Sequence, residues 1–277
     1  MGKEIPRHDY LFLMQFLREH LGHDLGEGKE YLLEGRLGPL AASLGLADVS
    51  TLIHRLRRGK DQPLGEAVLE AMITGETSFF RTTKMFDRLR RLAIPALMGA
   101  RASSRRLRIW CAACSTGQEP YSVAMTLADH FPTLRSWSVD LLATDTSERL
   151  LQRAREGLYS PAEVHRGLPK PALRKHFTPV GDRWQVAADL RRSIRFRKFN
   201  LLHTFTELGA RFDMIFMCNI LIYLDGTTKS HILARLREVI EPDGYLFLGE
   251  SETILGLTEH FTVTQGDDPF YRPAASP

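Results

Sequence analysis

Apolar side chains in the first quarter of the chain recur at three- and four-residue spacing, which is the pattern of amphipathic helices. Four stretches carry this pattern and predict helices over residues 8–22, 29–46, 48–59 and 64–74. Gly22 and Gly45 are expected to end the first two helices, and Asp48 or Ser50 to cap the third. Because no strand pattern occurs before about Leu107, this region is predicted to be all-helical.

After Leu107 the pattern changes to buried strands that alternate with amphipathic helices. Short apolar runs predict strands at 107–113, 138–145, 193–200, 212–219 and 245–251. Helical patterns lie between several of these strands, at 118–131, 147–157 and 228–240. Such alternation is typical of a largely parallel, doubly wound sheet.

Two segments depart from this alternation. Residues 175–192 contain two short β-like pieces around Gly181 and Asp182, which predict a small antiparallel insertion. Residues 261–265 and 270–273 are predicted to close the sheet as a hairpin. We therefore expect an α/β fold in which a small N-terminal helical domain precedes a doubly wound, largely parallel Rossmann-like sheet. The expected boundaries are 1–76 for the helical domain, 77–106 for a connecting segment and helix, 107–273 for the sheet domain, and about 162–192 for the antiparallel β insertion.

The composition fits this picture and narrows the class of protein. The 277 residues are 43% hydrophobic and 25% charged, as in ordinary globular proteins. Since the sequence has no run of about 18 apolar residues and no signal peptide, we expect no membrane insertion. Three cysteines, an odd number, give no disulfide framework and favour a cytoplasmic location. The net charge of +4 suits an acidic partner but is also that of a plain hydrated surface.

Polar residues follow three of the predicted strands, where ligands bind in an open parallel sheet. Ser115, Thr116 and Gly117 come after the first strand, Asp145 ends the second, and Asn219 ends the fourth. Gly117 lets the backbone approach a ligand, and the helix after it offers free N–H groups. An acid at the end of the second strand can accept hydrogen bonds from ribose hydroxyls. Ordinary caps and turns would use the same residue types, so both interpretations stay open at this point.

The glycines distinguish between nucleoside ligands. A dinucleotide site requires G-x-G-x-x-G, and a triphosphate site requires G-x-x-x-x-G-K-[ST]. The chain has only Gly117 in the turn and has no such phosphate loop. A cofactor with ribose and adenine but no phosphate fits better, and S-adenosylmethionine is the common one.

Other chemistries receive less support. Cys111 and Cys114 have the spacing of a redox pair, but such a pair belongs at the start of a helix and these residues lie in and at the end of a strand. The ten histidines show no ligand spacing and no H-E-x-x-H, so no metal is expected. A G-x-S-x-G nucleophile turn is also absent from the sequence.

Several longer segments resemble the CheR family, chemotaxis methyltransferases that transfer a methyl group from S-adenosylmethionine to receptor glutamates. The resemblance covers essentially the whole chain. It rests on ITGETSFFR, IWCAACSTGQEPYSVAMTLAD, LLATDTSERLLQRAREGLYS, FRKFNLL, FDMIFMCNILIYLD and EPDGYLFLGESE, in this order.

By this resemblance, Arg81 and Tyr223 stand at the methyl-transfer end of the site as the expected catalytic residues. The residues that the resemblance assigns to S-adenosylmethionine, or to its product S-adenosylhomocysteine, are Thr77, Arg81, Gly117, Glu119, Asp145, Asn200, Leu201, Cys218 and Asn219. Three positions depart from the family pattern: Gly75 stands where Asn is usual, Gln118 where Glu is usual, and Cys218 where Arg is usual. Gly75 and Cys218 each remove a polar group, so the cofactor affinity is expected to differ from that of a typical member.

The implied partner is the cytoplasmic helical bundle of a methyl-accepting chemoreceptor, and a monomer suffices for this role. Because the acceptor is a carboxylate, basic side chains are candidates for receptor contact: Arg36, Arg55, Arg57, Arg58 and Lys60. A solvated helix face explains each of them equally well. Family members that grip a tethering peptide at the receptor's C-terminus carry a longer Gly-rich loop in the insertion than PVGDR, so independence of a tether is expected.

Two rival functions remain. A nucleic-acid methyltransferase would share the fold, and a pI of about 9.0 is compatible with it. The chain has Asn219-Ile220-Leu221-Ile222 in place of the D/N-P-P-Y/F turn and has no aromatic-basic patch, so no nucleic-acid partner is expected. A non-catalytic receptor adaptor with a vestigial pocket is the other alternative, and it draws on Gly75 and Cys218.

Overall fold

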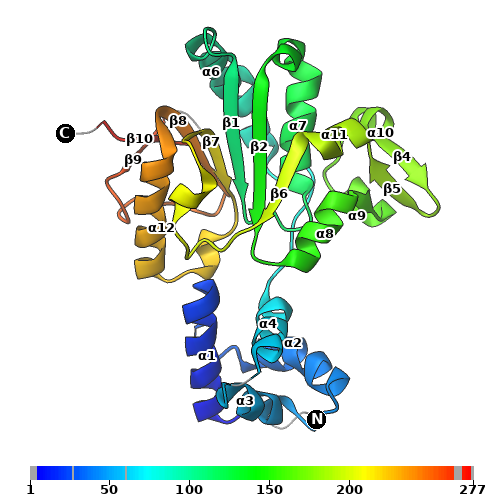
Figure 1. Ribbon diagram of the computed structural model, residues 1–277, viewed down its shortest axis with the longest axis vertical. Coiled ribbons are helices and arrows are strands. Elements are labelled where there is room, and N and C mark those ends of the chain that lie inside the picture. The colour runs from blue at the N-terminus through cyan, green and yellow to red at the C-terminus, as the bar shows by residue number, and fades with distance from the viewer. Residues whose placement is uncertain (1–4, 27, 60, 265–269, 276–277) are drawn as a thin grey trace. The chain divides into compact units, whose positions relative to one another are not determined.

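The computed structural model describes residues 5–26, 28–59, 61–264 and 270–275. Contacts divide the chain into two units, one of residues 1–74 with 223–228 and one of residues 75–222 with 229–277. The first is helical and the second holds the sheets (Figure 1). The short segment that begins at Tyr223 therefore belongs with the N-terminal helices.

The helical unit contains α1 (Arg7–Leu21), α2 (Glu30–Ser43), α3 (Val49–Arg57) and α4 (Gln62–Met72), which confirms the four predicted helices. Gly22 ends α1 with φ of 70°, a left-handed conformation that glycine adopts without strain. Asp48 caps α3 by accepting the Thr51 N–H at 2.8 Å. Leucine side chains of α1 and α2 are fully buried in the core of this unit, together with apolar residues of α3 and α4: Leu13, Leu17, Leu33, Leu37, Leu52, Ile53 and Val68.

The large sheet has the strand order β6-β2-β1-β7-β8-β10-β9. Its first five strands are parallel, and the β10 and β9 strands add antiparallel at the end, so the predicted fold class is confirmed. The order reverses at β1, because β2 and β6 lie on one side of it and β7 and β8 on the other. The strands are β1 (Arg106–Ala112), β2 (Ser138–Asp145), β6 (Ile194–Lys198), β7 (Phe212–Met217), β8 (Ile240–Leu248), β9 (Phe261–Val263) and β10 (Tyr271–Pro273).

Helices connect these strands, as the alternating pattern predicts. The segment before β1 forms α5 (Thr83–Arg88), a π-helical turn (Leu89–Ala93) and α6 (Ile94–Ala100). The crossovers contain α7 (Gln118–His130), the 3-10 turn Pro132–Ser136, α8 (Glu148–Glu156), the 3-10 turns Phe205–Leu208 and Leu221–Tyr223, and α12 (Gly226–Val239). None of the helices among the described residues combines the length and apolar character that a membrane span requires.

The insertion between α8 and β6 forms a second, three-stranded sheet of order β3-β5-β4. The antiparallel pair β4 (Phe177–Val180) and β5 (Arg183–Val186) is the predicted hairpin, and β3 (Leu158–Tyr159) is an additional strand that the sequence pattern does not reveal. Short helices flank the hairpin: α9 (Pro161–His165), α10 (Lys170–His176) and α11 (Ala188–Ser193).

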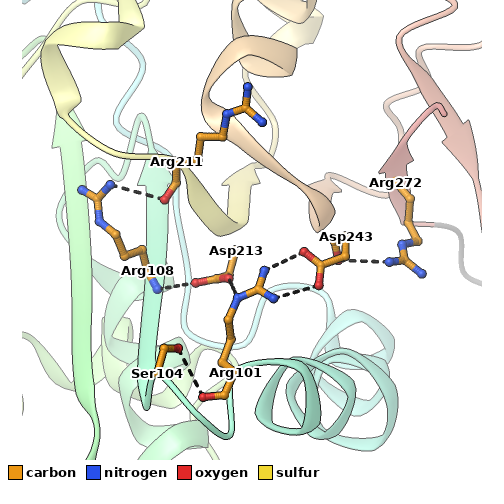
Figure 2. Close-up of polar contacts among 7 residues, drawn as sticks. All are labelled: Arg101, Ser104, Arg108, Arg211, Asp213, Asp243 and Arg272. Carbon is orange, nitrogen blue, oxygen red and sulfur yellow. Dashed lines mark hydrogen bonds and ion pairs between the residues drawn. The ribbon is translucent and has the colours of Figure 1, made fainter. Parts of the chain in front are cut away.

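A partly buried ionic cluster stabilises the sheet at the edge where β1 and β7 begin (Figure 2). Asp213 accepts the Arg108 backbone N–H and the Arg101 Nε–H, both at 2.7 Å. Asp243 pairs with the two terminal nitrogens of Arg101 at 2.9 and 2.6 Å, and this hydrogen-bonded pair holds the pKa of Asp243 below its usual value. The cluster therefore stabilises the edge opposite to the strand ends where a ligand is expected.

Candidate active site

The turn after β1 adopts an unusual backbone conformation. Ala113, Ser115 and Gly117 have φ of 54°, 51° and 95°, although only glycine adopts such values without strain. A Cβ atom at Gly117 would lie 2.9 Å from the Ala154 Cβ and 3.2 Å from the Tyr159 hydroxyl oxygen, so no side chain fits there. Strain of this kind gathers at functional sites when the surrounding structure enforces it. The turn therefore presents its backbone closely and in one defined shape.

Asp145 at the end of β2 holds this turn in place. Its carboxylate accepts the Ser115 N–H at 2.8 Å on one oxygen and the Ser147 N–H at 3.0 Å on the other. The side chain is 6% exposed. An ionised carboxylate can accept several hydrogen bonds at once, so the role of Asp145 in holding the turn is compatible with contact to a ligand's hydroxyl groups.

Glu119, in the first turn of α7, is the titratable centre of the site. Burial raises its pKa to about 7, the negative charge of Glu252 adds to the rise, and a hydrogen bond with Cys218 and the positive charge of Arg81 oppose it. Glu119 at the start of α7 and Cys218 directly after β7 thus meet near the reversal point of the sheet. Cys218 also lies 3.9 Å from the Met85 sulfur, measured from Sγ to Sδ.

Asn219 follows β7 in a left-handed conformation with φ of 60°. Its backbone N–H donates to the Glu252 carboxylate at 2.6 Å. Among the described residues, the half-buried side-chain amide of Asn219 has no hydrogen-bond partner. An amide that donates and accepts, and lacks partners at the carboxyl edge of a parallel sheet, suits the polar end of a ligand.

The segment 75–81 lies against the β1 turn and α7. The Gly75 carbonyl accepts the Ser115 hydroxyl at 2.9 Å, and the Phe80 N–H donates to the Ser122 hydroxyl at 3.0 Å. Thr77 between them is half-buried, and Arg81 is exposed with its guanidinium 3.3 Å from the Glu76 carbonyl oxygen. A Cβ at Gly75 would lie 3.3 Å from a Leu150 methyl carbon, so a larger residue at this position would require Leu150 to shift slightly.

Asn200 and Leu201 form the turn after β6. The Asn200 side-chain oxygen accepts the Leu202 N–H at 3.0 Å, and the Arg235 guanidinium donates to the Leu202 carbonyl at 2.8 Å. The turn is tied to β2, because the Phe199 N–H donates to the Asp145 carbonyl at 2.9 Å. The expected adenine frame is thus a hydrogen-bonded turn beside Asp145.

Tyr223 belongs to the helical unit, where its ring lies 5.6 Å from that of His23 between centroids. Its carbonyl accepts the Asp24 N–H at 2.7 Å, and Leu224 forms an isolated antiparallel bridge with His23. The resemblance did not predict this pairing. Tyr223 follows directly on Ile222, whose N–H donates to Glu252 at 3.4 Å.

Most of the basic side chains expected to face the receptor already have partners within the helical unit. Arg36 donates to the Met72 carbonyl and the Thr74 hydroxyl, at 2.5 and 2.8 Å. Arg55 pairs with Asp61 at 2.6 Å and Arg57 with Asp9 at 3.0 Å. Arg58 is exposed and has no charged partner among the described residues, whereas Lys60 lies outside them.

The structure does not support a redox role for Cys111 and Cys114. Cys111 and Cys114 are both buried, and burial raises their pKa values well above the usual range, so both thiols stay protonated. Helix α7 begins only at Gln118, four residues after Cys114.

The sequence analysis did not identify one cluster of potential metal ligands in the helical unit. His8, Asp9 and His54 offer potential ligand atoms that all lie within 4.8 Å of one another. One carboxylate oxygen of Asp9 accepts a hydrogen bond from Arg57 at 3.0 Å, so this carboxylate already has a positively charged partner. The expectation of a metal-free protein remains an expectation.

Comparison with known proteins identifies the two units. A family model described as the CheR methyltransferase all-alpha domain matches residues 8–73, and one described as the CheR methyltransferase SAM binding domain matches residues 75–270. The chain belongs to the CheR methyltransferase family. This CheR chain is therefore an S-adenosylmethionine-dependent methyltransferase of the chemotaxis type.

Relatives of the CheR chain agree with this assignment. It is 38% identical to chemotaxis protein methyltransferase Cher2 of Pseudomonas putida, over 90% of this chain and 92% of the relative. It is also 38% identical to chemotaxis protein methyltransferase 1 of Pseudomonas aeruginosa, over 93% and 94%. A solved structure of magnesium protoporphyrin IX methyltransferase from Synechocystis with bound SAM is more distant, at 15% identity and a TM-score of 0.35 over 69% of this chain and 77% of that one.

The residues of the sheet unit fit S-adenosylmethionine. The turn after β1 admits a close ligand at Gly117, Asp145 offers carboxylate oxygens for ribose hydroxyls, and Glu119 and the Asn219 amide offer polar partners for an amino acid end. Glu252, which the sequence analysis did not single out, joins two of these turns.

Proposed function

We propose that this CheR chain transfers the methyl group of S-adenosylmethionine to glutamate side chains of chemoreceptors, giving glutamyl methyl esters and S-adenosylhomocysteine. The observation that carries the proposal is that the carboxyl edge of a parallel sheet holds both an acid, Glu119, and the amide of Asn219, which has no hydrogen-bond partner among the described residues. The names of the relatives, chemotaxis protein methyltransferases, support the receptor as the acceptor.

In this proposal each turn of the site holds one part of the cofactor. Gly117 allows the close backbone approach, Glu119 binds the amino acid or ribose part, and Asp145 accepts from the ribose hydroxyls. Asn200 and Leu201 frame the adenine, and Asn219 with its neighbour Cys218 holds the methionine end. Thr77 and Arg81 line the methyl-transfer end.

The protein does not need to supply acid–base catalysis for this reaction. When bound, the cofactor supplies a sulfonium whose methyl carbon bonds to the attacking carboxylate oxygen while the carbon–sulfur bond breaks and leaves its electron pair on sulfur. A glutamate with an ordinary pKa of about 4.3 is already ionised at neutral pH, so no general base is needed. The protein contributes alignment and the exclusion of water, and well-oriented reactants gain about 7–11 kcal/mol in this way.

Arg81 and Tyr223 are the residues to which we assign this alignment. Arg81 is exposed, and among the described residues its guanidinium donates one long hydrogen bond, to the Glu76 carbonyl, so it is available for an acceptor carboxylate. Tyr223 offers a ring to the sulfonium or a hydroxyl to the carboxylate. We expect Arg81→Ala to lose most of the turnover and to keep its melting temperature, and wild-type turnover in this variant would exclude Arg81 from the mechanism.

The acceptor is a carboxylate in the cytoplasmic helical bundle of a receptor, and basic side chains of the helical unit would contact it. Arg58 is the first candidate, since it is exposed and unpaired among the described residues, while Arg55 and Arg57 would have to share their existing acidic partners. The β4–β5 turn contains only Gly181 and Asp182, which favours docking that needs no receptor tether.

The test is transfer of labelled methyl from S-adenosylmethionine to chemoreceptor cytoplasmic fragments, followed by treatment with alkali. A carboxyl methyl ester releases its label as methanol, and this is the expected result. Alkali-stable label would point to a nitrogen acceptor, as in a nucleic-acid or amine methyltransferase. A protein that binds receptor but no cofactor would be the adaptor that Gly75 and Cys218 leave as the second candidate.

A further inference from the structure

Glu252 connects two turns of the site without belonging to the expected cofactor set. It lies four residues after β8, and its side chain is 9% exposed. One carboxylate oxygen accepts the Asn219 N–H at 2.6 Å and the Gly249 N–H at 2.8 Å, and the other accepts the Ile222 N–H at 3.4 Å. A single buried acid thus gathers backbone donors from the end of β7 and the end of β8.

The neighbouring backbone leaves little freedom to Asn219. A Cβ atom at Gly249 would lie 2.6 Å from the Asn219 Nδ2 and 2.8 Å from its Cγ, so the bare glycine backbone packs directly against the amide. Asn219 itself holds φ of 60°, which costs free energy for a residue other than glycine and persists only where contacts enforce it. The hydrogen bond to Glu252 is such a contact.

Glu252 also acts on the site through its charge. Its carboxylate is one of the groups that raise the pKa of Glu119, on which Arg81 and Cys218 act in the opposite direction. The other titratable groups that interact with Glu119 are the buried thiols of Cys111 and Cys114, which stay protonated. Removal of the Glu252 charge would therefore lower the pH at which Glu119 ionises.

We propose that Glu252 is a positioning residue for cofactor binding, whose carboxylate fixes the turn of Asn219 so that the amide faces the methionine end of the ligand. This inference rests on the proposed function only in so far as that function places S-adenosylmethionine at Asn219. It predicts that changes at Glu252 act through Asn219 and through the charge of Glu119.

The experiment measures the binding of S-adenosylhomocysteine to the full chain by calorimetry between pH 6 and 8, in the absence of receptor. Glu252→Gln removes the charge and turns an amide N–H₂ group toward backbone donors. Glu250→Gln is the matched control, because Glu250 is exposed two residues away and loses the same charge. Gly249→Ala displaces the Asn219 amide and leaves Glu252 untouched.

For Glu252→Gln we expect Kd to rise about tenfold or more, the loss that follows when the displaced Asn219 amide no longer makes one hydrogen bond to a charged group of the ligand. The pH midpoint of binding is expected to fall below that of the wild type, a change that a purely structural role would not produce. Gly249→Ala should raise Kd at an unchanged midpoint, and Glu250→Gln should change neither. In an Asn219→Ala background, Glu252→Gln should add little to the rise of Kd, because the amide that Glu252 positions is already absent.

Wild-type Kd in Glu252→Gln, or effects of Glu252→Gln and Asn219→Ala that simply add, would overturn the positioning role. If Glu252→Gln does not fold, a Gly249→Ala protein with wild-type Kd would overturn it equally, since the position of the turn would then not matter. Absence of binding by the wild-type protein would instead contradict the proposed function, so the two failures are distinguishable.

Discussion

The charge of Glu119 predicts how cofactor binding depends on pH. In the empty site burial raises the pKa of Glu119 to about 7, whereas an ammonium or hydroxyl group of the bound ligand favours the ionised carboxylate. The pKa is then higher in the empty protein than in the complex. Binding therefore releases a proton below pH 7, and the affinity rises as the pH increases through 7.

The magnitude follows from the fraction of Glu119 that is ionised. With a pKa of about 7, about one tenth of the empty sites are ionised at pH 6 and about nine tenths at pH 8. Since the apparent Kd equals the intrinsic Kd divided by this fraction, the Kd at pH 6 should be about ten times the Kd at pH 8.

Titration calorimetry with S-adenosylhomocysteine measures this dependence directly. Buffers with different ionisation enthalpies should show release of about one proton at pH 6 and of very few at pH 8. Glu119→Gln is the control, because any slope that it retains belongs to the ligand or to other groups. A wild-type Kd that is constant between pH 6 and 8, or an equal slope in Glu119→Gln, would refute the assignment of Glu119 to the cofactor.

Three further predictions concern packing, the ionic cluster and the thiols. Gly117→Ala should lower the free energy of unfolding by about 3 kcal/mol in urea titrations, because it combines left-handed strain with a steric clash. Gly181→Ala is the control, since Gly181 also has a positive φ but nothing lies within 4 Å of its Cβ, and it should lose only about 1 kcal/mol. Equal losses in the two variants would contradict this reasoning. Asp213→Ala should lower the free energy of unfolding by about 3 kcal/mol, while its affinity for S-adenosylhomocysteine stays unchanged. Asp87→Ala, at an exposed ion pair, should lower the free energy of unfolding by less than about 1 kcal/mol. A weakened cofactor affinity in Asp213→Ala would show that the ionic cluster acts on the site. Cys111 should react with thiol reagents only when the protein unfolds, and Cys111→Ala should retain methyl transfer. Rapid labelling of Cys111 in the native protein, or loss of methyl transfer in the variant, would support a functional role for this thiol.

The sequence predicts the elements of this fold well because their patterns are local. Buried runs such as 138–145 and 212–219 are long enough to show their apolar character, whereas the two residues of β3 are too few to show any period. The turn after β1 is also visible as Gly117, but the left-handed conformations of Ala113 and Ser115 depend on Asp145, which lies some thirty residues away.

The parts of the site that escaped prediction depend on long-range contacts. Glu252 follows Asn219 by 33 residues and reveals its role only through hydrogen bonds to backbone atoms, which leave no pattern of residue types. The partners of Arg36 likewise lie at and just after the end of α4, so a side chain that looks free in the sequence has hydrogen-bond partners in the structure. The resemblance to the CheR family was confirmed, and the roles that it assigns to single residues remain predictions.

The most direct test of the central claim is to locate the methyl group on the acceptor. A chemoreceptor cytoplasmic fragment and the same fragment with its candidate glutamates changed to glutamine would be incubated with the enzyme and labelled S-adenosylmethionine, and the label mapped by mass spectrometry before and after alkali. The account predicts label on glutamate side chains only, its loss as methanol in alkali, and none on the glutamine variant. Label that persists in the glutamine variant, or that survives alkali, would contradict it.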